Sequence, residues 1–226
     1  ASSTVLGLNS RKYHGLLVAS FNPSGQRTVC LSKLDEDLFL DGQIFRLGSN
    51  EFKDVIYPKG YTFLREFEVA PFPIFTYQIP QVKIKKTVFM PQSKNLTIVL
   101  YNILNMSSND LKIHIYPLIL CRHFHNVINQ LKNPMIFTQE QDSQMVHLTF
   151  TNPDSTISSY CSLGKFVEKP NWVYSLHYRE ENIRGESDTE DAYQPGYFEL
   201  PIKANNKTEF AIVTAAERKK QLVVQT

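Results

Sequence analysis

Alternating apolar and polar residues constrain the fold of this chain more than any other feature. Residues 82–89 and 111–116 place an apolar side chain at nearly every second position, as a strand does when only one face is buried. Turn-forming residues interrupt the chain about every ten positions, which is typical of many short strands. The sequence therefore predicts an all-β fold, an antiparallel β-sandwich of many short strands with few or no helices. The predicted turns are at residues 23–25, 58–60, 71–73, 105–110, 152–154 and 205–206.

Other segments carry β-branched or aromatic residues on both faces, so we expect strands buried between two layers. Asp41-Gly42 separates two apolar arms and predicts a hairpin over residues 38–45, because both turn positions need a positive φ. Evidence for helix is limited to residues 123–131 and to the residues after Ala216. No linker or repeat divides the sequence, so we predict one domain. The strands expected to be buried on both faces are residues 27–31, 96–104, 172–178 and 210–214.

Composition excludes several classes of protein. Hydrophobic residues make up 42% of the 226, too many for a disordered chain and enough for a sizeable core. Because 24 Lys and Arg nearly balance 22 Asp and Glu, no overall basic field favours nucleic acid, and Lys83, Lys85 and Lys86 lie on a single strand. The longest purely apolar runs are about four residues, far short of a membrane-spanning helix. With three cysteines and no signal-peptide pattern over residues 1–8, we predict a cytoplasmic protein.

The segment from Asn9 to Gly15 is dense in hydrogen-bonding groups and precedes an apolar strand. Arg11 and His14 are suited to hold a polar ligand such as a sugar, with Tyr13 stacking on it. The alternative is a structural loop in which Arg and Tyr tie down the neighbouring backbone, and composition alone favours this alternative.

Residues 180–191 contain six carboxylates. Paired carboxylates are what glycoside hydrolysis requires, but a run of acids is unspecific, and a solvated acidic loop explains it as well. The embedded Arg184-Gly185 and the turn that follows favour a shaped loop, in which we expect Arg184 to pair with carboxylates.

Cys121, His123 and His125 alternate along a predicted strand, so their side chains share one face there. This spacing is half of a metal site, but zinc needs three or four ligands and no partner cluster is visible elsewhere. We therefore expect a strand end with hydrogen-bonded histidines and no metal.

Five segments, in this order, resemble the N-terminal domain of glycogen debranching enzymes of the bacterial and archaeal amylo-α-1,6-glucosidase type. The resemblance implies a β-supersandwich like the N-terminal domains of glucoamylase-like hydrolases. It also implies that the parent enzyme removes α-1,6-linked glucose at glycogen branch points, with its catalytic carboxylates on a helical (α/α)6 barrel and no cofactor. His123 departs from the family pattern, where Asp is common. The segments are residues 4–19, 27–36, 88–91, 117–118 with Arg122 and His125, and 181–198.

From this resemblance we expect residues 1–226 to form a single β-sandwich domain, the N-terminal part of a longer enzyme. Its partners would be the C-terminal (α/α)6 catalytic domain of the same protein and an α-glucan, and it would contain no catalytic residue. Two alternatives are a stand-alone carbohydrate-binding module for α-glucans and a complete small glycosidase that uses the acidic loop as its catalytic pair. The residues expected on the glycan-side or barrel-facing surface are Arg11, Tyr13, His14, Arg122, His125, Arg184, Asp188, Glu190 and Asp191.

Overall fold

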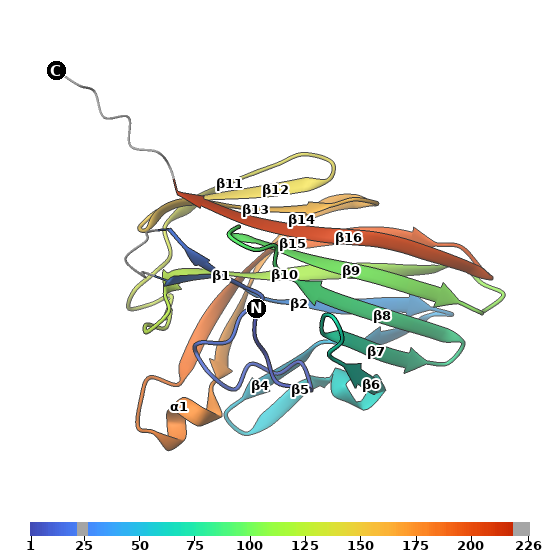
Figure 1. Cartoon of the computed structure of the whole chain (residues 1–226), viewed down its shortest axis with the longest axis horizontal. Helices are drawn as coiled ribbons and strands as arrows, with labels where there is room; N and C mark the ends of the chain where they lie inside the picture. The colour runs from blue at the N-terminus through green and yellow to red at the C-terminus, as the bar shows by residue number, and fades with distance from the viewer. Residues whose placement is uncertain (22–26, 219–226) are drawn as a thin grey trace.

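The computed structural model describes residues 1–21 and 27–218. Within these residues, two large antiparallel sheets enclose one hydrophobic core, and the hairpin β4–β5 and the short helix α1 lie together at one margin (Figure 1). The predicted all-β antiparallel sandwich is confirmed. None of the helices in the described part of the chain is long and apolar enough to cross a membrane.

The first sheet has six strands in the order β1-β2-β10-β15-β14, with β3 paired to β2. The second has eight strands in the order β11-β12-β13-β16-β9-β8-β7-β6. The strands of the first sheet are β1 (Leu17–Ser20), β2 (Arg27–Leu40), β3 (Gln43–Arg46), β10 (Leu111–His123), β14 (Lys165–His177) and β15 (Thr189–Ile202). Those of the second are β6 (Leu64–Glu68), β7 (Ile74–Ile79), β8 (Val82–Phe89), β9 (Leu96–Asn105), β11 (Phe137–Gln141), β12 (Met145–Thr151), β13 (Asp154–Cys161) and β16 (Asn206–Arg218). The remaining elements are β4 (Ser49–Phe52), β5 (Val55–Lys59), the 3-10 helix η1 (Gly60–Phe63) and α1 (Arg179–Ile183).

Two local predictions are confirmed at the level of single residues. Strand β8 alternates between buried and half-buried side chains along its whole length, as its sequence pattern requires. The hairpin β2–β3 turns at Asp41 and Gly42, with φ values of 50° and 73°, as an Asp-Gly turn between two strands demands.

Other predictions are wrong. Residues 172–177 belong to β14, which lies at the edge of its sheet and is largely exposed rather than buried on both faces, and the buried Tyr178 follows the strand. Residues 96–104 and 210–214 alternate in burial, because each strand turns only one face to the core. Residues 123–131 form no helix, and β16 runs on through Arg218. The remainder of the predicted C-terminal helix and the whole of the predicted turn at 23–25 lie outside the described residues.

The outer face of the six-stranded sheet carries aromatic and charged side chains. On β10, Ile113 and Ile115 face the core, so His114 and Tyr116 face outward. The His114 ring stacks on Tyr197 of β15 with centroids 4.1 Å apart. This face is therefore polar and aromatic, unlike the apolar face that meets the second sheet.

Asp37 lies on this outer face, and burial raises its pKa to about 6, although the nearby Arg46 acts against the shift. Asp35 and Glu36 on the same strand raise this pKa further, and the Tyr116 side chain lowers it. Because the folded chain holds this proton more tightly than the unfolded chain, its stabilising effect is complete below about pH 4 and is lost as the pH rises through about 6.

We expect Asp37→Asn to raise the free energy of unfolding by about 1 kcal/mol near neutral pH, a figure reduced for partial exposure of the carboxylate. Below about pH 4 the same substitution should have almost no effect, because the aspartic acid is then neutral in both states. Urea unfolding of both proteins at the two pH values measures this difference. An equal effect at both pH values would contradict the assignment of the proton to Asp37.

Candidate functional site

The loop before β1 is fixed to the sheet by its own hydrogen bonds. The Thr4 hydroxyl is within hydrogen-bond distance of the backbone N–H and carbonyl of Leu8, and the Asn9 amide donates to Ser32 of β2. At Gly15 a Cβ would lie 3.1 Å from the Leu31 carbonyl oxygen, so this position favours a residue without a side chain. The loop therefore enters the sheet in a defined path and presents residues 9–14 at one end of the sandwich.

Helix α1 and the residues after it lie against this loop, although about 170 residues separate them in sequence. The Arg11 guanidinium donates to Glu181 Oε1 at 3.0 Å, and the Glu181 side chain is almost fully buried. Lys12 Nζ lies 3.2 Å from Glu186 Oε2, and the Glu180 N–H donates to the Ser10 carbonyl. The first and last sequence motifs are thus brought together by ion pairs between them.

A buried ion pair lies beneath the two motifs. The Arg122 guanidinium makes two hydrogen bonds to the Glu190 carboxylate and donates to the Lys12 carbonyl at 2.7 Å. Tyr178 donates its hydroxyl to the same carboxylate, and the Ile128 N–H donates to it at 3.0 Å. Burial alone would lower the pKa of Arg122, but the Glu190 charge outweighs it and raises that pKa. Every partner of Glu190 therefore comes from within the fold.

Asp191 holds neighbouring segments of backbone, whereas Asp188 bonds to side chains of its own loop. Asp191 is buried and accepts from the Gln130 N–H at 2.9 Å and the Ser175 N–H at 3.0 Å. Asp188 is half-buried and accepts from the Asn182 amide at 2.6 Å. Burial would raise the pKa of Asp188, but hydrogen bonds from Asn182 and Thr189 outweigh this effect and lower it.

Tyr13, His14 and His125 lie closer to solvent. The Tyr13 hydroxyl is 3.1 Å from His125 Nδ1, and the Arg11 guanidinium lies over the Tyr13 ring at 5.2 Å. Burial lowers the pKa of His14, and the positive charge of Arg11 adds to this effect. His14 Nδ1 is buried and has no hydrogen-bond partner among the residues that the structure describes.

The expectation that Arg184 pairs with the carboxylates is wrong. Arg184 is exposed and forms no ion pair with the described residues, whereas Arg11 fills that role opposite Glu181. Arg184 follows directly on Ile183, whose side chain is 77% exposed, so this end of α1 projects away from the sandwich.

Cys121 does not join His123 and His125, whose ring centroids lie 5.3 Å apart. Cys121 is buried with its sulfur 3.4 Å from the Ser155 hydroxyl, and burial raises the pKa of its thiol to about 11. His123 and His125 are both exposed. Within residues 1–21 and 27–218, no group of three or more His, Cys, Asp or Glu side chains is placed to hold a metal ion.

Residues 1–209 match the family described as "Glycogen debranching enzyme N terminal". The chain belongs to this family. A search of curated protein sequences found no match. Among solved structures, a bacterial glucoamylase complexed with acarbose is 11% identical with a TM-score of 0.46, over 97% of this chain and 33% of that one. A polysaccharide lyase is 9% identical with a TM-score of 0.44, over 83% of this chain and 25% of that one. The chain thus spans a third or less of the length of these two proteins.

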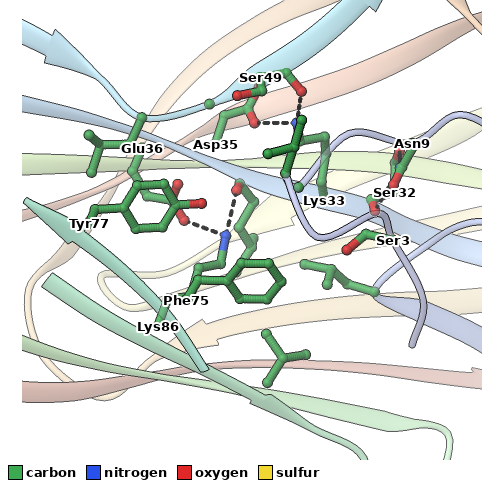
Figure 2. Close-up of a pocket in the computed structure, with 17 residues that line it drawn as sticks. Ser3, Asn9, Ser32, Lys33, Asp35, Glu36, Ser49, Phe75, Tyr77 and Lys86 are labelled. Atoms are coloured by element: carbon green, nitrogen blue, oxygen red, sulfur yellow. Dashed lines mark hydrogen bonds and ion pairs between the residues drawn. The ribbon is translucent and has the colours of Figure 1, made fainter. Parts of the chain in front are cut away.

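This member of the glycogen debranching enzyme N-terminal family also buries charges between its two sheets (Figure 2). Lys86 Nζ donates to Glu36 Oε1 at 2.6 Å and to the Leu34 carbonyl at 3.0 Å, and Tyr101 donates its hydroxyl to the same Glu36 oxygen. Nearby, Lys33 Nζ donates to the Ser49 carbonyl and lies 3.1 Å from Asp35 Oδ1. The adjoining cavity of about 30 Å³ has room for little more than a water molecule, so this cluster is not a sugar site.

Sequence reasoning missed three of the residues that build these clusters: Glu181, Tyr178 and Lys86. For Lys86 the signal was present, because alternation along 82–89 places it on the same face as the apolar Ile84 and Val88. A lysine at an inward position of an alternating strand indicates a buried partner. For Glu181 and Tyr178 the partners come from distant segments, and no local pattern marks them.

Proposed function

We propose that this chain is the non-catalytic N-terminal domain of a glycogen-debranching amylo-α-1,6-glucosidase. In this proposal it packs against a helical (α/α)6 catalytic domain of the same protein. The family match supports the parent activity. The state of Glu190 supports the absence of catalysis here, since its carboxylate is fully buried and already accepts hydrogen bonds from Arg122, Tyr178 and Ile128. A carboxylate so placed cannot reach a glycosidic bond.

The docking part of the proposal rests on a set of loops that buried ion pairs hold in place and that expose apolar side chains at their tips. We name the anchored loop surface as residues 9–15, 124–134 and 178–188, which the buried pairs of Arg122 and Glu181 hold in place. At its tips, Leu131 is 95% exposed and Ile183 is 77% exposed. Loops positioned by a fixed scaffold commonly carry binding residues, and in this proposal the helical domain buries the Leu131 and Ile183 side chains. The predicted surface residues Arg11, Tyr13, His14, His125, Arg184 and Asp188 lie on the same loops.

The test uses the full-length enzyme and, in parallel, this chain and the helical domain expressed separately. Leu131→Asp with Ile183→Asp is expected to weaken binding of this chain to the helical domain by about 30-fold, the effect of losing an interface hot spot. In the full-length enzyme the same change should reduce release of glucose from branch points.

Met106→Asp is the control, because Met106 is also exposed but precedes β10, whereas residues 124–134 follow it at the other end of that strand. If the control and the double variant bind the helical domain equally well, the anchored loop surface is not the docking site. If the chain binds no helical domain and binds an α-glucan, the stand-alone binding module takes the place of this proposal.

A further inference from the structure

A hollow of about 360 Å³ lies on the outer face of the six-stranded sheet, and none of its lining residues belongs to the anchored loop surface. Its floor comes from β2, β10, β15 and β14, and its wall comes from β3 and β5. Neighbouring strands lie about 4.8 Å apart, so the floor is roughly 14 Å across, the length of a short oligosaccharide. The volume is at the lower end of the range for small-molecule sites. The side chains that matter here are Asp37, Arg46, Tyr57, Tyr116, Asn171 and Gln194.

The hollow contains polar groups that the fold does not use. Asn171 and Gln194 face each other across the β14–β15 pair, and neither side-chain amide bonds to another described residue. The Tyr57 hydroxyl is likewise free among the described residues, and the Tyr57 side chain is 57% exposed. Each amide offers both donors and an acceptor, which matches the paired donor and acceptor character of adjacent sugar hydroxyls.

The charged side chains that line the hollow are Asp35, Asp37 and Arg46, two carboxylates and one guanidinium. A nitrogen of Arg46 lies 3.9 Å from an Asp37 carboxylate oxygen, and Lys33, outside the hollow, lies 3.1 Å from Asp35 Oδ1. A site for phosphate or another anion needs an excess of positive charge, which this hollow lacks. An aromatic surface adjoins it, because Tyr116 packs against Tyr197 with ring centroids 5.4 Å apart. Aromatic rings with a few well-placed polar groups suit a ligand with both C–H faces and hydroxyls.

We propose that this hollow binds one or two hexose units of a neutral glycan, with Asn171 and Gln194 bonding hydroxyls and Tyr57 closing over the sugar. That the glycan is an α-glucan rests on the proposed function. The binding site itself does not, since it is built from residues that take no part in the anchored loop surface.

The experiment is a calorimetric or NMR titration of the 226-residue chain with maltotriose and, in parallel, with cellotriose. Saturable maltotriose binding is expected, and Asn171→Ala with Gln194→Ala should weaken it about tenfold. Tyr57→Ala should weaken it by a similar factor. Tyr174→Ala is the matched control: Tyr174 is 56% exposed on β14 yet stacks on Trp172, which packs toward the core, and its loss should leave affinity unchanged.

The proposal is overturned if neither trisaccharide binds. It is also overturned if the affinity is unchanged in Tyr57→Ala and in the Asn171→Ala, Gln194→Ala double variant. Equal affinity for the two trisaccharides supports the hexose site and counts against an α-glucan as its ligand. If the Leu131→Asp, Ile183→Asp double variant loses docking but still binds the sugar, the proposed sugar site is supported and the two surfaces are independent.

Discussion

Arg122→Met is expected to lower the free energy of unfolding by about 3–5 kcal/mol, because it leaves the Glu190 charge buried without its cation. The guanidinium supplies two of the hydrogen bonds to that carboxylate and one to the Lys12 carbonyl, all inside the protein. Removing one member of such a pair costs more than the pair contributes, since the remaining charge cannot be solvated. Urea unfolding, with an unchanged slope against denaturant, measures the loss.

A double variant separates charge from packing. In Arg122→Met with Glu190→Gln, the amide at position 190 still accepts from the Tyr178 hydroxyl and the Ile128 N–H but carries no charge. We therefore expect the double variant to be more stable than Arg122→Met alone, a non-additive result. Arg46→Met is the control, because its ion pair with Asp37 spans 3.9 Å near the surface and should contribute less than about 1 kcal/mol. A loss below about 1 kcal/mol for Arg122→Met would contradict its role as the anchor of the loops.

Much of the fold could be predicted because strand periodicity is a local property. The residues of 82–89 and of the Asp41-Gly42 turn determine these two elements without distant partners, and the structure has both. Residues 123–131 mark the limit of this reasoning. Their backbone N–H groups at Ile128 and Gln130 are used by Glu190 and Asp191, about 60 residues away, so no helix can use them. No window of sequence around these residues contains that information.

The candidate site could be predicted only in part, because its side-chain partners come from distant segments. The two motifs that the sequence singles out do meet in space, but the partner of Arg11 is Glu181, and Arg184 is left outside. Sequence proximity favoured Arg184 for the carboxylates around it. In the structure the loop before β1 contacts α1 through Arg11 instead, although β1 and β14 lie at opposite edges of their sheet. The burial of Arg122 and Glu190 could not be predicted either. Charged residues are seldom fully buried unless they are paired, and this pair joins residues that are far apart in the sequence.

The charges between the sheets give the last prediction. Lys86→Met is expected to lower the free energy of unfolding by about 3–5 kcal/mol. The Glu36 carboxylate then stays buried and charged, with the Tyr101 hydroxyl as its one remaining side-chain partner in the described part of the chain. The neighbouring residue provides a matched control: Lys85 points to the opposite, outward face of β8, so Lys85→Met should change stability by less than about 0.5 kcal/mol.

A double-mutant cycle at Lys86 and Glu36 tests whether the two residues stabilise the protein as a coupled pair. Glu36→Gln keeps an acceptor for Tyr101 while removing the charge, so adding it to Lys86→Met should restore part of the lost stability. Alone, Glu36→Gln should destabilise the protein, since the buried Lys86 ammonium then loses its carboxylate partner. If the losses of the two single variants simply add in the double variant, the ion pair is not coupled. The lysine would then stabilise the sandwich through its bond to the Leu34 carbonyl and the packing of its stem.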